Sequence, residues 1–147
     1  YQDRLQVTRS HQLALPIVFF SPLQFLFFYD EPDALEASPE LELWHDLPTT
    51  WDETRYLNGA IGEYITLARR RGDVWYLASI TNAQARVLST RLDFLEADQT
   101  YRATKFFDGE DGGVRVDVLE LQSGDVLEMP MRPSGGYSLI IRPAPNP

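Results

Sequence analysis

The sequence predicts a mainly β protein, an antiparallel β-sandwich of about eight short strands preceded by helical segments. Two observations support this fold class. The spacing of apolar residues changes at Pro48, from helical spacing before it to runs of β-branched and aromatic residues after it. Those runs are short, recur at steady intervals and are separated by glycine-containing turn sequences. The chain therefore divides into a helical part, residues 1–47, and a β domain, residues 48–147.

The first apolar segment, Ser10–Tyr29, carries no formal charge if His11 is neutral. Its length could span a bilayer. However, Pro16 and Pro22 would break an ordinary helix interior, and neither an aromatic belt nor a basic loop flanks the segment. We therefore expect no membrane span. We expect instead two short buried helices, the second beginning at Ser21-Pro22, because a serine N-cap followed by proline is a common start signal.

A polar connector that contains two prolines, Asp30–Glu40, separates this segment from a third helix. Residues Pro39–Leu47 have the spacing of a short amphipathic helix, with Ser38 as its N-cap and Pro48 as its end. One side of this helix is apolar and consists of Leu43, Trp44 and Leu47.

After Pro48 the sequence reads as strands and tight turns. In the run from Arg86 to Phe94 the alternation is clear, with Leu88, Leu92 and Phe94 on one face. The turns contain Gly next to Asp, Ser or a second Gly, which favours tight hairpin connections. The predicted strands are Trp51–Leu57, Ile61–Arg69, Val74–Ile80, Arg86–Phe94, Thr100–Phe107, Val114–Leu121, Val126–Met131 and Tyr137–Arg142.

The composition excludes several classes of function. Of the 147 residues 44% are hydrophobic, which suits a globular core, and the formal net charge is −9. An acidic chain is a poor partner for nucleic acid or for an anionic membrane surface, because phosphate binding requires a basic stripe. The chain has no cysteine, so it forms neither disulfides nor thiolate metal sites and fits either redox compartment.

The sequence begins at Tyr1 and shows no signal-peptide pattern. We therefore expect that the native protein is longer.

Asp52 and Glu53 follow Trp51, a combination that is common in sugar-cleaving sites. Adjacent strand residues point to opposite faces, whereas a glycosidase acid pair must face one bond across roughly 5 to 9.5 Å. We therefore interpret these carboxylates as strand-edge groups that pair with an arginine, Arg55 or Arg69.

The remaining polar motifs have ordinary structural interpretations. His11 and His45 lack the spacing of metal ligands, and no GxSxG motif is present. The acidic loop Asp108–Gly113 contains oxygen ligands of the kind that calcium binds, but a hairpin turn accounts better for it. The tripeptide Arg71-Gly-Asp73 matches an adhesion motif and also suits a tight turn. No catalytic, cofactor-binding or metal-binding residue is predicted.

Several aromatic residues could form a platform for a sugar ring. Trp75 and Tyr76 are neighbours in one strand, so alternation predicts that one of them is exposed and the other buried. Core packing is the alternative for the whole group of aromatic residues considered, Trp44, Trp51, Trp75, Tyr76, Tyr101 and Tyr137.

The order of the segments resembles the C-terminal end of glycoside hydrolase family 97. The shared words are HQLALPIVFFSPLQF, then LPTTWDETRYLNGAIGEYITLARRRGDVWYLASITN, then RVLSTRLDFL and YRATKFFDG. They cover the chain from about Arg9 to Gly109. Many separate words in one order make the resemblance more specific than a single motif.

This resemblance implies a fold and a role. Family members are calcium-dependent α-glucosidases or α-galactosidases with a (β/α)8 barrel followed by a β-sandwich. Residues 1–47 would be the helical end of that barrel, and residues 48–147 the C-terminal sandwich, regarded as non-catalytic with a part in oligomerisation. The family's catalytic carboxylates and calcium ligands lie upstream of the HQLA word, so none is transferred here. A periplasmic or secreted location is also implied.

The leading hypothesis is a non-catalytic C-terminal domain of a calcium-dependent α-glycosidase, with a structural and oligomerisation role. Its expected partners are the catalytic barrel of the same chain and a second copy, with carbohydrate as substrate of the whole enzyme. The apolar side of SPLQFLFFY would then make the isolated chain associate.

The alternative function is a carbohydrate-binding module that uses Trp75 or Tyr76 to bind sugar. A third possibility, a stand-alone enzyme, would need two convergent carboxylates, which the sequence does not show.

Overall fold

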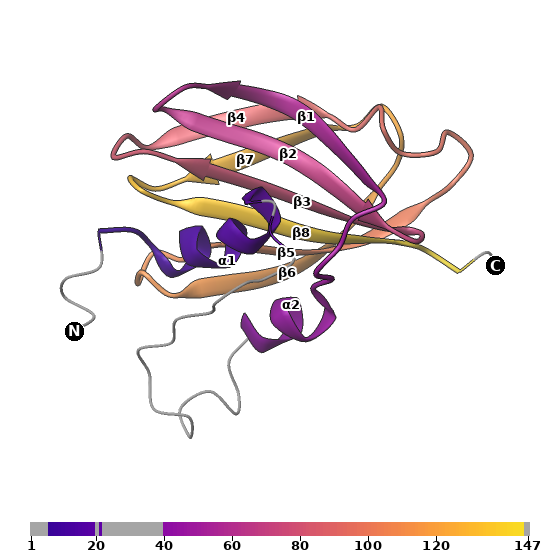
Figure 1. Ribbon diagram of the computed structural model, residues 1–147, viewed down its shortest axis with the longest axis horizontal. Helices are drawn as coiled ribbons and strands as arrows, with labels where there is room; N and C mark the ends of the chain where they lie inside the picture. Colours follow the sequence, from indigo (N-terminus) through magenta and orange to yellow (C-terminus); the bar gives the residue numbers. More distant parts are fainter. Residues whose placement is uncertain (1–5, 20, 22–39, 146–147) are drawn as a thin grey trace.

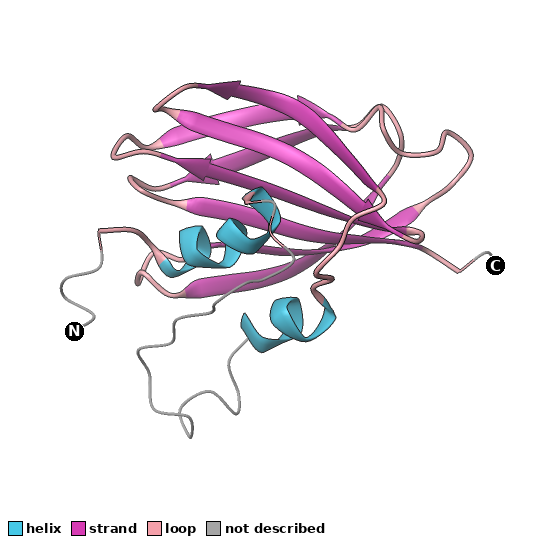
Figure 2. Ribbon diagram, in the orientation of Figure 1, coloured by secondary structure: helices cyan, strands magenta, loops and turns pink. Residues whose placement is uncertain are grey.

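The computed structural model describes residues 6–19, 21 and 40–145, in which two helices and eight strands form three layers. A six-stranded antiparallel sheet is the middle layer (Figure 1). A two-stranded sheet covers one of its faces, and the helices pack against the other (Figure 2). We call these two faces the strand side and the helix side. The predicted mainly β, antiparallel sandwich is confirmed.

The eight strands follow the eight predicted runs. The six-stranded sheet has the order β1-β2-β3-β8-β5-β6, and β4 pairs with β7 in the second sheet. All of these pairings are antiparallel. The bounds are β1 Glu53–Ala60, β2 Tyr64–Arg71, β3 Val74–Thr81, β4 Arg86–Arg91, β5 Tyr101–Asp108, β6 Val114–Leu121, β7 Val126–Met131 and β8 Gly136–Pro143.

Two strands are shorter than predicted because turns occupy their ends. Strand β2 begins at Tyr64, since Ile61, Gly62 and Glu63 form the turn that joins it to β1. Gly62 adopts φ 76°, a left-handed conformation that glycine accepts without a steric penalty. Strand β4 ends at Arg91, because the chain turns there to the loop that leads to β5.

The strand side contains the larger apolar core. Its buried residues come from strands β2, β3, β5, β6 and β8 of the large sheet, from β7, and from the loop after β4. Leu88 and Phe94 pack at its margin and Leu92 lies fully inside it, as the alternation predicted. The buried members are Ala68, Trp75, Leu77, Leu92, Leu95, Tyr101, Ala103, Leu121, Leu127, Met129, Met131, Tyr137, Leu139 and Ile141.

Helix α1, Arg9–Val18, packs across the helix side of the sheet. Thr8 is its N-cap, and the Thr8 hydroxyl accepts a hydrogen bond from the backbone N–H of His11 at 3.1 Å. The expectation that Pro16 breaks the helix interior is wrong, because α1 continues through Pro16 to Val18. Pro16 is buried, so packing against the sheet offsets the backbone hydrogen bond that proline cannot donate.

Helix α2, Glu40–Asp46, lies within the predicted range 39–47. Leu43 is fully buried in the helix-side core, and Trp44 and Leu47 pack against that core, which confirms the predicted apolar side. The Ser38 cap, the predicted helix from Ser21-Pro22 and most of SPLQFLFFY lie outside the described residues. Within the described part of the chain, neither helix combines the length and the apolar character that crossing a membrane requires.

Candidate functional site

Asp52, just before β1, closes the turn between β2 and β3. Its Oδ1 accepts a hydrogen bond from Arg71 Nη1 at 2.7 Å, and its Oδ2 accepts one from the backbone N–H of Gly72 at 2.8 Å. The Gly72 hydrogen bond, with the Arg71 guanidinium, holds the pKa of Asp52 below its ordinary value. The Arg71-Gly-Asp73 tripeptide thus forms the predicted tight turn, with Gly72 at φ 57°.

Glu53, at the start of β1, pairs with two arginines. Its Oε1 accepts from Arg55 Nε, and its Oε2 accepts from Arg70 Nε at 3.2 Å. Desolvation alone would raise the pKa of Glu53, but the hydrogen bonds and charges of Arg55 and Arg70 outweigh it and lower the pKa. The predicted pairing with Arg55 is confirmed. The side chains of Asp52 and Glu53 are thus held by different arginines, and their contacts are structural.

Arg69 does not pair with Asp52 or Glu53 as the alternative prediction supposed. It is 4% exposed, and its Nε and Nη2 donate to the backbone carbonyls of Ile17 and Val18 at 2.6 and 3.1 Å. These carbonyls belong to the last turn of α1, where the helix leaves acceptors unsatisfied. Arg69 Nη1 also donates to the hydroxyl of Thr54 at 3.2 Å. Arg69 therefore joins the end of α1 to β1 and β2.

The prediction that one of Trp75 and Tyr76 is exposed is wrong. They are 5% and 4% exposed, because the helix side and the strand side of β3 are both covered. Trp75 packs on Phe94 with ring centroids 4.7 Å apart. Tyr76 packs on Trp51 at 5.3 Å and donates its O–H to the carbonyl of Asp46 at 2.8 Å. Neither ring offers a free face to a sugar, which corrects the carbohydrate-platform hypothesis.

The two histidines lie on different helices. His11, on α1, places Nδ1 3.2 Å from the carbonyl of Gly135 in the turn between β7 and β8. His45, on α2, is exposed and lies 3.0 Å from Asp46, which also forms an ion pair with Arg142. The contact of His11 with Gly135 joins α1 to the turn before β8, and the ion pair of Asp46 with Arg142 joins α2 to β8.

The acidic loop Asp108–Gly113 forms the predicted hairpin turn, between β5 and β6. The carbonyls of Gly109 and Glu110 accept hydrogen bonds from Arg132 Nη1 at 3.0 and 3.1 Å. A guanidinium therefore occupies the side of the loop where a calcium ion would need these oxygens. Across the described residues, no three His, Asp or Glu side chains gather as a metal site would require.

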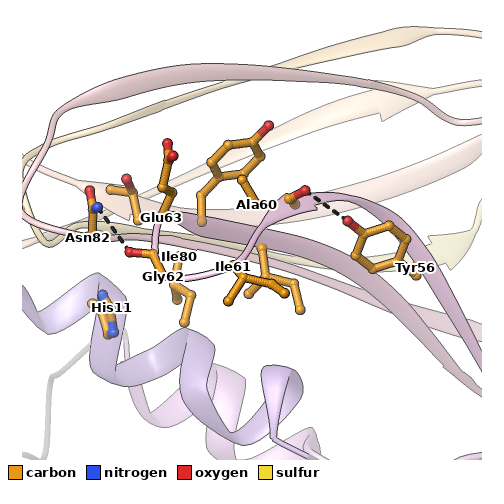
Figure 3. A pocket seen from close by; sticks show the side chains of 12 residues that line it. His11, Tyr56, Ala60, Ile61, Gly62, Glu63, Ile80 and Asn82 are labelled. Carbon is orange, nitrogen blue, oxygen red and sulfur yellow. Dashed lines mark hydrogen bonds between the residues drawn. The ribbon is translucent and has the colours of Figure 1, made fainter.

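An open apolar groove of about 430 Å³ lies between α1 and the turn from β1 to β2 (Figure 3). His11 and Tyr56 stand at its two ends, and Ile61 and Ile80 lie between them. Ile61 is fully exposed to solvent although it is apolar, and Tyr56 is 64% exposed. This is where α1 leaves part of the helix side uncovered.

The polar groups around the groove bind one another. The Tyr56 hydroxyl donates to the carbonyl of Gly59 at 3.0 Å, and Asn82 Nδ2 donates to the carbonyl of Gly62 at 3.1 Å. Glu63 forms an ion pair with Arg86 at 2.8 Å. Such a lining suits an apolar side chain better than a sugar, whose hydroxyls require available polar partners.

Sequence reasoning missed this groove. It assigned Ile61 to a strand and treated His11 only as a possible metal ligand. The glycine in Ile61-Gly62 was the available signal for a turn, but no local pattern shows that α1 lies beside this turn.

Comparison with characterised proteins shows relatives that are about five times longer. The chain is 38% identical to a retaining alpha-galactosidase of Bacteroides thetaiotaomicron, over 93% of this chain and 21% of that protein. It is 30% identical to a probable retaining alpha-galactosidase of Streptomyces bingchenggensis, over 88% of this chain and 20% of that protein. The chain thus spans about a fifth of the length of these relatives.

Solved structures of glycoside hydrolases also resemble this chain. A glycoside hydrolase family 97 enzyme from a Pseudoalteromonas species, in complex with acarbose, superposes with a TM-score of 0.87 at 30% identity. The superposition covers 97% of this chain and 23% of that one. A beta-arabinopyranosidase superposes with a TM-score of 0.77, also at 30% identity, over 92% of this chain and 21% of that one.

The family comparison agrees with the sequence relatives and with the solved structures. Residues 50–142 match the family described as glycosyl-hydrolase 97 C-terminal, oligomerisation. The match covers well over half of the chain, and the chain therefore belongs to this family of C-terminal oligomerisation domains of glycoside hydrolases.

Proposed function

We propose that this chain is the non-catalytic C-terminal domain of a longer, calcium-dependent α-glycosidase, and that it serves stability and subunit contact. The observation that carries the proposal is the state of Asp52 and Glu53. Each carboxylate is held by hydrogen bonds and ion pairs to arginines, and Asp52 also by a turn amide. A glycosidase needs one such acid to donate a proton and a second to face the same bond. The described part of the chain uses these two acids to tie strands together.

The proposed substrate of the whole protein is an α-galactoside, cleaved with retention of configuration. This part of the proposal is supported by the names of two relatives, which are 38% and 30% identical to the chain. Residues 1–47 would belong to the end of the catalytic barrel, and the catalytic acids and calcium ligands would come from the preceding part of the polypeptide. A periplasmic or secreted location is proposed from the family resemblance.

The test begins with the native gene product. An antibody against residues 48–147 should detect a band several times heavier than 16.8 kDa in extracts of the source cell. The purified protein should hydrolyse an aryl α-galactoside faster than the matching aryl α-glucoside, and EDTA should remove the activity until calcium is restored. A band at 16.8 kDa would contradict the proposal, as would activity that is indifferent to EDTA.

A further inference from the structure

We propose that the groove between α1 and the β1–β2 turn is the contact through which two copies of this protein associate, with Ile61 of each copy entering the groove of the other. The inference rests on the proposed role in subunit contact and names the residues that perform it. The family description gives oligomerisation as the role of this domain, so a second copy is the expected occupant.

The groove and Ile61 have matching chemistry. Ile61 is fully exposed in the described part of the chain, so these residues leave its apolar side chain in water. The groove beside it is lined by Ile65, Ile80 and the ring of Tyr56. An isoleucine side chain removed from water into such a lining is favoured by the hydrophobic effect.

The arrangement of Ile61 beside the groove suits two-fold symmetry. An isologous interface requires that each copy present a projection and the matching recess on one surface patch. Ile61 lies at the rim of the groove, between His11 and Tyr56 (Figure 3). One two-fold axis near Ile61 would therefore make the same contact twice.

The local charge also allows two copies to approach. This chain carries a formal net charge of −9, which opposes the approach of two copies of it. At the groove, the Glu63 carboxylate is neutralised by its ion pair with Arg86. The other titratable groups that line the groove are His11, whose pKa burial lowers, and the side chains of Tyr56 and Tyr64. Association should therefore strengthen as salt screens the remaining repulsion.

The experiment measures the mass of the full-length gene product by analytical ultracentrifugation over a range of concentrations. Ile61→Asp places a charge in the partner's groove and should raise the dissociation constant of the dimer about 100-fold. Val87→Asp is the matched control, because Val87 is 67% exposed on β4 in the other layer. It should leave the dissociation constant within about twofold of the wild type.

Three other outcomes would overturn the inference in distinguishable ways. A wild-type dimer that Ile61→Asp leaves intact would overturn the groove contact but keep the proposed oligomerisation role. A wild-type protein that stays monomeric at every concentration would overturn both the groove contact and the proposed oligomerisation role. If Ile61→Asp instead lowers the unfolding temperature of the monomer while Val87→Asp does not, another part of the same polypeptide covers the groove.

Discussion

The two faces of the six-stranded sheet are covered by different means. On the strand side, β4 and β7 bury a continuous apolar core, and every contributor to it lies after residue 48. On the helix side, α1 and α2 bury a smaller core and are fixed by directional contacts, above all those of Arg69 and Tyr76. The strand side should therefore set the stability of the fold. The helix side holds earlier segments in place and leaves a groove for contact with a partner.

The largest expected effect is on the strand side. Leu139 is fully buried in its core, so Leu139→Ala should lower the free energy of unfolding by about 2–5 kcal/mol. Urea denaturation followed by tryptophan fluorescence measures this loss, with the exposed Val118→Ala as the control. A loss equal to that of Val118→Ala would show that this face does not govern stability.

The next effect should be local to the helix side. Arg69→Met would leave the carbonyls of Ile17 and Val18 without their guanidinium donor, which should cost about 2–3 kcal/mol. Hydrogen exchange should show faster exchange of the α1 amides than of the amides in β4 and β7. Equal acceleration in all of these elements would contradict the division of the sheet into two differently covered faces.

Gly136 offers a third test, because α1 lies unusually close to it. A Cβ added at Gly136 would stand 2.5 Å from the Cα of His11 and from the carbonyl oxygen of Ser10. Gly136→Ala should therefore push α1 away from β8 and cost about 1–3 kcal/mol. At Gly113 the nearest atom would be 3.4 Å away, so Gly113→Ala is the control and should be tolerated. Calorimetry that finds the same unfolding temperature for both variants would refute the close approach.

A smaller, pH-dependent effect should arise from His11. Burial lowers the pKa of His11 below its ordinary value, although hydrogen bonding to the Gly135 and Ser134 backbone partly raises it. The unfolded chain therefore binds more protons than the folded chain as the pH falls through about 6.5, and stability decreases on acidification. Urea midpoints at pH 7.5 and 5.5 should differ less in His11→Gln than in wild type or His45→Gln. The same pH dependence in all three would contradict this role for His11.

The sequence predicted the strands well, because local signals determine them. Alternation and glycine turns such as Gly72 define each element within a few neighbouring residues. Alternation failed at Trp75 and Tyr76, because it assumes that one face of a strand meets water, and here both faces are covered. Whether a face is covered depends on segments far away in the sequence.

In the candidate site, too, local sequence patterns predict contacts between near neighbours but not contacts between segments that are far apart in the sequence. The Glu53–Arg55 pair joins residues two positions apart and could be predicted. The contact of Arg69 with the end of α1 joins residues 51 and 52 positions apart, and no spacing rule indicates it. The groove likewise forms only when α1 lies beside the β1–β2 turn.

The non-catalytic role proposed for this chain can be tested directly at Asp52 and Glu53. The double variant Asp52→Asn, Glu53→Gln is made in the full-length gene product, and its kcat on an aryl α-galactoside is measured with calcium present. Because both carboxylates form structural contacts with arginines, kcat should stay within about twofold of wild type. A fall of about 1,000-fold or more, in a protein that remains folded and keeps its oligomeric mass, would place an acid of this chain in the reaction and contradict the non-catalytic role.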